Sequence, residues 1–209
     1  MKIGTKSVLY GAHCFFIHPW FVFAAWWKLY GFPFDPRLWV AFFVHDLGYW
    51  GKPNMDGKEG ETHVVWGARV MLRLFDKKRK DGTPEDLTWY EFCLLHSRYY
   101  AKQLEKQPSK LCYADKLAIC LEPAWFYLFR VNLSGEIKEY MALAKTRTKQ
   151  GEPVTKYESM RLNGDSQFAW FYSMTEYLRR WVAVHKDGAK DTWTPSETRE
   201  VINENGVWK

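Results

Sequence analysis

Cysteine is scarce in this chain and lacks the spacing of a metal site or a disulfide framework. The four cysteines, at positions 14, 93, 112 and 120, form no CxxC pair and lie within otherwise apolar segments. This pattern favours buried free thiols over a cysteine zinc site or a secreted disulfide scaffold. It predicts a cytoplasmic protein.

Long charge-free stretches are also rare. Residues 7–27 carry no Asp, Glu, Lys or Arg and would be long enough to cross a bilayer. However, Gly11, His13, His18 and Pro19 interrupt the segment, and only residues 15–27 are densely apolar. A stretch of that length is more often a buried core helix, and no signal-peptide cleavage pattern follows it. The sequence therefore predicts no membrane partner.

The alternation of apolar and polar residues that marks half-buried strands is scarce as well, whereas helix start and stop signals recur along the chain. These signals predict an all-α fold. Residues 145–163 have the weakest pattern. The expected helices cover residues 19–30, 36–48, 64–75, 83–104, 109–122, 134–151 and 165–185, with a last one beginning at 194.

Size and composition indicate one ordered globular protein. With 209 residues, 47% of them hydrophobic and 18% aromatic, the chain can bury one core but cannot hold a second catalytic domain. We expect a core domain in residues 1–130 and a helical extension packed on it in residues 131–209. The formal net charge of +6 favours anionic ligands such as phosphates, nucleic acid or a membrane surface without selecting among them.

Histidine and aspartate carry the chemical signal. Five of the six histidines precede residue 100 and lie among apolar or aromatic residues. A single histidine on an apolar face is usually a satisfied core residue, and we interpret His13 and His185 in this way. The adjacent His45 and Asp46 differ, because they follow the apolar residues 39–44 and would leave a carboxylate charge facing the core. A bound divalent metal would remove that cost.

These residues form a pattern that resembles the HD superfamily of metal-dependent phosphohydrolases, which reads H…HD…D on successive helices. His18, with Val22 four positions later, is similar to the first motif of the family. His45 and Asp46 are similar to the central motif, and Asp115 is similar to the last. The resemblance covers roughly residues 11–123 and implies an HD-domain-like helical bundle with a C-terminal helical extension.

Two more histidines resemble the branches of the superfamily that bind several metals. The segment THVVWGA at 62–68 is similar to the HxxxGA helix start of the HD-GYP type, and His96 falls where that branch places another histidine. Nitrogen and oxygen ligands in this number suit two divalent cations bridged by Asp46, with Mn, Fe, Mg, Ni or Co favoured at least as readily as Zn. The implied metal ligands are His18, His45, Asp46, His63, His96 and Asp115.

The resemblance implies a phosphoric ester hydrolase in which a metal-activated water attacks phosphorus. The expected substrate is a small phosphorylated molecule, in particular a mono-, tri- or cyclic nucleotide. Besides Asp46, the expected catalytic residues are Lys52, which would hold phosphate oxygens, and Glu61, which would shuttle a proton or orient a ligand imidazole. A carboxylate at a helix N-terminus is the competing interpretation of Glu61.

Basic and aromatic side chains near the ligand motifs are the expected substrate contacts. The basic groups would hold phosphate oxygens, and the tyrosines would stack on a nucleobase, because aromatic faces bind bases with little sequence demand. Exposure on a solvated surface is an equally good explanation for the lysines. Packing in the core is an equally good explanation for the tyrosines. The expected contacts are Lys52, Arg98, Tyr99, Tyr100 and Lys116, with Tyr49 and Trp50 as further stacking groups.

Two other functions fit the same residues. The H…HD…H…H…D pattern also describes di-iron oxygenases of the superfamily, which cleave C–C or C–P bonds with dioxygen. An inactive nucleotide-binding or interaction module is the second alternative, supported by the positive charge and the aromatic content. A nucleic-acid partner is not favoured, because a duplex cannot easily thread to a metal site at the centre of a helical bundle. The sequence leaves a homo-oligomer open.

Overall fold

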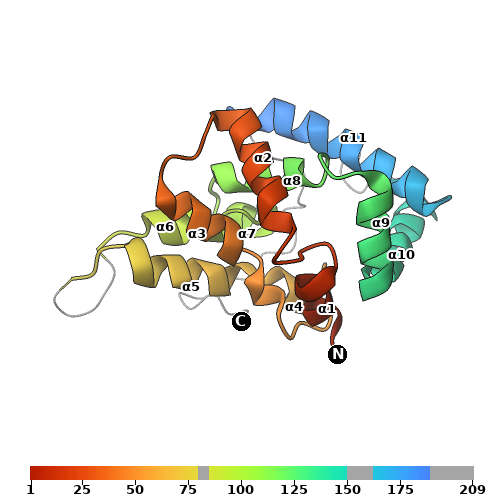
Figure 1. Cartoon of the computed structure of the whole chain (residues 1–209), viewed down its shortest axis with the longest axis horizontal. Coiled ribbons are helices and arrows are strands. Elements are labelled where there is room, and N and C mark those ends of the chain that lie inside the picture. Colours follow the sequence, from red (N-terminus) through yellow and green to blue (C-terminus); the bar gives the residue numbers. More distant parts are fainter. Residues whose placement is uncertain (80–84, 150–161, 189–209) are drawn as a thin grey trace.

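The computed structural model describes residues 1–79, 85–149 and 162–188, which form helices joined by loops (Figure 1). The expected all-α fold is confirmed for this part of the chain. In chain order the elements are α1 (Ile3–Tyr10), α2 (His18–Tyr30), α3 (Pro36–Val44), the 3₁₀ helix η1 (Leu47–Tyr49), α4 (Lys58–Glu61), α5 (Val64–Phe75), α6 (Thr88–Leu94), α7 (Arg98–Gln103), α8 (Lys110–Ala118), α9 (Ala124–Ser134), α10 (Glu136–Lys149) and α11 (Gln167–His185).

The main core lies between α2, α3, α5, α6 and α8. Helix α2 packs against α3 and α8, and α5 packs against α3 and α6 (Figure 1). Apolar side chains at helical spacing drive this packing: Val22 and Ala25 of α2, Phe42 of α3, and Ala68 and Met71 of α5 are almost fully buried.

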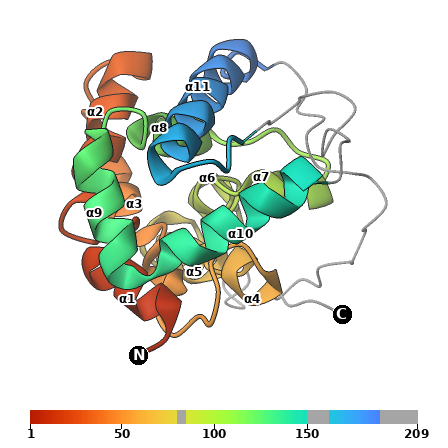
Figure 2. The same cartoon turned by 90° about the vertical axis from the view of Figure 1, so that its right-hand side faces the viewer.

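Helices α9, α10 and α11 form one side of the molecule (Figure 2). Helix α11 packs against α8 and α9, and α10 packs against α9 and α11. Trp170, Phe171, Trp181 and Val182 of α11 are only 2–3% exposed and belong to the main core cluster. The predicted boundary between residues 130 and 131 falls inside α9, and the division into two domains stays a prediction.

Helix ends agree with the sequence signals where a proline, a capping side chain or a glycine sets them. The Oδ1 atom of Asp35 accepts a hydrogen bond from the N–H of Arg37 at 2.9 Å, and Pro36 is the first residue of α3. Gly31 ends α2 with φ of 83°, and Gly188 follows α11 with φ of 99°. Such positive φ values favour glycine.

Three predicted helices end or break early. The helix predicted over 109–122 is α8, which ends at Ala118. Helix α3 ends at Val44 rather than Gly48, because the chain turns at His45 and Asp46 into η1. The single helix predicted over residues 83–104 is two helices, α6 and α7, since the hydroxyl of Ser97 starts a new helix by accepting a hydrogen bond from the N–H of Tyr100. The predicted starts at 83 and 194 lie outside the described residues.

Helices α1 and α9 have no counterpart among the predicted helices. The sequence of α9 hides its period, because Trp125, Phe129 and Leu133 are apolar but exposed, whereas Leu128 and Val131 are buried. The charge-free residues 7–27 are divided between the end of α1, a turn and the first part of α2. Across the described ranges, no helix is long and apolar enough to cross a membrane.

Candidate metal centre

The six predicted ligand residues meet in one buried cluster. Each is 1–8% exposed. Only Asp115 lies in the interior of a helix, so the expectation of ligands along successive helices needs correction: the helix breaks bring the other side chains to the centre. His18 begins α2, His45 and Asp46 follow α3, His63 directly precedes α5, and His96 lies between α6 and α7.

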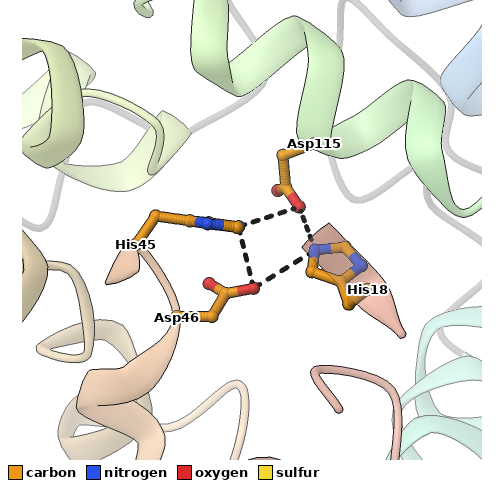
Figure 3. Close-up of side chains that lie close together, drawn as sticks. All are labelled: His18, His45, Asp46 and Asp115. Atoms are coloured by element: carbon orange, nitrogen blue, oxygen red, sulfur yellow. Dashed lines mark hydrogen bonds and ion pairs between the residues drawn. The ribbon is translucent and has the colours of Figure 1, made fainter. Parts of the chain in front are cut away.

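One half of the cluster joins His18, His45, Asp46 and Asp115 (Figure 3). The Nε2 atom of His18 lies 3.0 Å from Oδ1 of Asp115 and 3.3 Å from Oδ2 of Asp46. The Nε2 atom of His45 lies 3.0 Å from Oδ2 of Asp46 and 3.7 Å from Oδ1 of Asp115. Two imidazole nitrogens and two carboxylate oxygens therefore face one point.

The other half joins Asp46 to His63 and His96. Here the second carboxylate oxygen, Oδ1 of Asp46, lies 3.5 Å from Nε2 of His63 and 3.3 Å from Nε2 of His96. Those two nitrogens are 3.2 Å apart. The carboxylate of Asp46 thus stands between two groups of ligand atoms and turns one oxygen toward each.

Three of the imidazole rings are oriented by the same backbone device. The Nδ1 atoms of His45, His63 and His96 lie 2.9, 2.7 and 2.5 Å from the carbonyl oxygens of Phe42, Gly60 and Cys93, each three residues earlier in the chain. Because a carbonyl only accepts, each Nδ1 donates its proton. Each ring then turns Nε2 toward the cluster, as a metal-binding histidine does.

The donor set fits a cation. Because Nδ1 donates to a carbonyl on both rings, the Nε2 atoms of His63 and His96, 3.2 Å apart, can hydrogen-bond to one another only if one ring carries an extra proton, and a cation beside them would take the place of that proton. In the other half, Nε2 of His45 and Oδ2 of Asp46 are buried and lie 3.0 Å apart as an ion pair, and neither atom makes a hydrogen bond of good geometry within the described residues. A bound divalent ion would satisfy these atoms, so the cluster could hold metal.

Charges within the cluster are strongly coupled. Burial alone would raise the pKa of Asp46, but the surrounding imidazoles, His45 above all, hold it well below its usual range. Burial opposes charge on His45 as well, yet the nearby carboxylates raise its pKa to about 10. Burial and the neighbouring His96 instead lower the pKa of His63. A divalent cation held by these residues would be stabilised by the ionised carboxylate of Asp46 and would take the place of the proton on His45.

Two glycines let the elements that carry the ligands approach one another. A Cβ atom on Gly48 would lie 1.9 Å from the carbonyl oxygen of His63. A Cβ atom on Gly67 in α5 would lie 2.6 Å from the carbonyl oxygen of Val44 and 3.0 Å from the Cα of His45. The glycine of the segment 62–68 is thus explained by backbone contact between α5 and the chain at His45.

A cavity of about 320 Å³ opens beside the cluster and is lined by His18, His63, His96 and Asp115. Several predicted contact residues lie on its wall and three do not. Lys52 donates from Nζ to Oγ1 of Thr62, Tyr100 is fully buried, and Trp50 is 60% exposed. The predicted residues on the cavity wall are Tyr49, Glu61, Arg98, Tyr99 and Lys116.

The charged side chains of the wall are held in place. The Nζ atom of Lys116 lies 2.9 Å from Oδ2 of Asp115. Arg98 donates two hydrogen bonds of 3.1 Å to the hydroxyl of Tyr177 and stacks over Trp181 at 4.1 Å. The hydroxyl of Ser97 lies 3.3 Å from Oε2 of Glu61, whose pKa is raised by burial to about 7. Glu61 can therefore change its protonation state near neutral pH.

The two histidines interpreted as core residues differ in the structure. His185 has that role, because it is 3% exposed, stacks on Trp181 and donates from Nδ1 to that residue's carbonyl oxygen at 2.8 Å. His13 instead lines the cavity, with its ring 5.7 Å from that of His18 and its Nδ1 2.8 Å from the hydroxyl of Ser7. The sequence signal that could have indicated this role was the position of His13 in the charge-free segment, five residues ahead of His18.

The sequence also did not indicate that the C-terminal helices reach the cavity. Met174 and Leu178 of α11 and Leu143 of α10 lie on its wall, although they are distant in sequence from every ligand. Apolar residues at helical spacing give no sign of whether they face the core or a cavity. No protein-family model, curated protein or solved structure matches the chain.

Proposed function

We propose that the protein is an HD-type, metal-dependent phosphohydrolase that acts on a small phosphate ester, in particular a nucleotide. The observation that carries the proposal is the position of Asp46, whose two oxygens face two separate groups of ligand atoms. Carboxylate bridging suits a pair of divalent cations such as Mn, Fe, Mg, Ni, Co or Zn. Bound there, such a pair would activate a water for attack on phosphorus and neutralise phosphoryl charge.

The protein's own groups complement a phosphoryl substrate in the cavity. Lys116 is half-buried on the wall and presents a positive charge to phosphate oxygens, and Arg98 adds a second cation with fixed geometry. Glu61 has a pKa of about 7 because it is buried, so at neutral pH a large fraction of it carries a proton. A proton held at the Glu61 carboxyl can be delivered to the leaving oxygen.

Cavity size supports a small substrate rather than a polymer. A volume of about 320 Å³ is at the lower end of the range usual for small-molecule sites, roughly 300–1,000 Å³. The six candidate ligand residues are at most 8% exposed, so a nucleic-acid duplex could not bring a phosphate to them without opening the bundle. A mononucleotide is of the right size.

The test is phosphate release by metal-loaded protein from nucleoside mono-, tri- and cyclic phosphates, aryl phosphates and single-stranded oligonucleotides. We expect turnover of at least one small ester and a loss of about 10²–10⁴-fold in kcat for Glu61→Gln, since general acid–base catalysis typically contributes that much. Glu59→Gln is the matched control, because Glu59 is exposed and bonded to Asn54. Oxygen consumption by iron-loaded protein without phosphate release would establish the di-iron oxygenase instead.

A further inference from the structure

The outer side of α2 and the loop that follows it carry exposed aromatic side chains. Five of them are 43–86% exposed and form what we call the α2 aromatic surface: Phe16, Trp20, Trp27, Phe32 and Phe34. Half-buried rings join these five into one network of ring contacts, with ring centres 4.8–6.3 Å apart; the joining residues are Phe15, Phe23, Trp39 and Phe43. The surface is therefore continuous.

The α2 aromatic surface is large for a face in contact with water. Phe and Trp side chains have about 150–250 Å² of surface each, so the exposed fractions together amount to roughly 600 Å². That area equals the upper end of the range for the largest apolar patch on a typical monomer, about 300–600 Å². Singly exposed apolar residues are normal, whereas a continuous patch of this size marks a binding surface. None of the five residues lines the cavity beside the candidate metal centre.

The charges around this surface have one sign. Residues 1–34 contain three lysines and no Asp or Glu, and Lys28 of α2 is exposed directly after Trp27. The first acidic residue of the chain, Asp35, is paired with Arg37 at 2.7 Å. A second copy of the chain on this face would bring lysines together without carboxylates to pair with them. An anionic partner would instead be attracted.

A second apolar stripe lies on the same side of the molecule. Helices α2 and α9 both lie along the left edge of the view in Figure 2. Trp125, Phe129 and Leu133 recur at every fourth position of α9 and are 58–67% exposed. Residues 123–135 contain no acidic residue, and their one arginine, Arg130, is buried. An extended surface can cover both helices, whereas a single bound peptide would cover only one of them.

We infer that this side of the molecule docks on an anionic lipid surface. Tryptophan and phenylalanine with lysine beside them are the side chains that bind the headgroup region of a bilayer, because apolar burial and attraction to anionic lipids add together there. Such a contact is peripheral and needs no helix that crosses the membrane. It revises the expectation from the sequence, which weighed only a spanning segment. The inference does not rest on the proposed function.

Co-sedimentation of the full chain with sucrose-loaded vesicles tests the inference. Vesicles of phosphatidylcholine with about one third phosphatidylserine are compared with vesicles of phosphatidylcholine alone, and we expect the anionic vesicles to bind the protein more tightly. Trp27→Ser should weaken that binding about tenfold, because the apolar ring no longer leaves water on docking. Trp66→Ser is the matched control, since Trp66 lies on α5 outside the α2 aromatic surface and is 50% exposed, against 55% for Trp27.

A second variant, Lys28→Gln, tests the charge and should weaken binding to the anionic vesicles about fivefold, while all variants keep a helical circular dichroism spectrum. Equal losses in Trp27→Ser and Trp66→Ser, equal binding to both kinds of vesicle, or binding to neither would overturn the inference. Sedimentation velocity of the protein without vesicles tests the other occupant. A dimer that Trp27→Ser dissociates, with no binding to vesicles, would assign the surface to a second copy of the chain instead.

Discussion

At the scale of single residues, which histidines and aspartates would cluster was predictable, and the orientation of their side chains was not. Histidine and aspartate in apolar surroundings indicate a metal site because the alternative is a buried, unpaired polar group. The hydrogen bonds that turn Nε2 of His63 and His96 inward depend on backbone carbonyls that only the folded chain brings into range. The same limit explains His13, whose place on the cavity wall follows from the turn after α1.

A second cluster of buried ionisable residues, separate from the candidate metal centre, holds the turn after α1. Arg130 donates to the carbonyl oxygen of Gly11 and to Glu122, and Oε2 of Glu136 accepts a hydrogen bond from the N–H of Ala12 at 2.9 Å. Glu136 is fully buried, and its Oε1 has no partner among the described residues. Burial raises the pKa of Glu136 from its usual 4.5 to about 7. The folded protein therefore retains a proton that the unfolded chain loses near pH 4.5.

The sign of the pH effect follows from this difference. Because the folded state binds more protons, protonated Glu136 stabilises the folded state fully below pH 4.5. This contribution to the free energy of unfolding, roughly 3 kcal/mol, is lost as the pH rises from 4.5 to about 7. Glu136→Gln should remove that part of the pH dependence, whereas Glu176→Gln on the exposed surface of α11 should leave it unchanged. Urea unfolding of the wild-type protein and the two variants between pH 4.5 and 7.5 measures this pH dependence. Parallel curves of unfolding free energy against pH for all three proteins would refute the role of Glu136.

At the scale of elements, caps and prolines were reliable guides, and helix breaks at the site were not. Asp35 and Pro36 set the start of α3 as predicted. Its end at Val44 and the gap between α6 and α7 were missed, because apolar and aromatic residues resume directly after the short polar breaks at 45–46 and 96–98. His45, Asp46 and His96 all lie in these breaks. Local helix propensity is therefore overridden by tertiary structure at the point where the candidate ligands converge.

Gly67 tests whether close packing of α5 sets the ligand geometry. In Gly67→Ala the new methyl group meets the carbonyl oxygen of Val44, the Cα of His45 and the Sγ of Cys93. We expect a loss of about 1–3 kcal/mol in the free energy of unfolding and a lower metal content. Leu74→Ala, on the exposed side of α5, should cost less than about 1 kcal/mol and keep the metal. Urea unfolding with elemental analysis compares them, and full stability of Gly67→Ala would contradict the explanation.

At the scale of the whole molecule, the fold class was predictable from helix signals, but the cavity was not. Its wall combines candidate metal ligands with residues of α8, α10 and α11 that are separated by long stretches of chain. Figure 2 shows α10 and α11 on one side of the molecule, and Leu143 of α10 and Met174 and Leu178 of α11 line the cavity. Helical periodicity marks a residue as inward-facing, but only the assembled bundle decides whether it meets another side chain or an enclosed space.

Elemental analysis of purified, metal-loaded variants tests the central claim, which is that Asp46 joins two metal sites. We expect about two divalent ions per chain in the wild-type protein, about one in His63→Ala and in His96→Ala, and none in Asp46→Ala, all with helical circular dichroism. His185→Gln, a buried histidine outside the cluster, should keep both ions. Full metal content in Asp46→Ala would contradict the account.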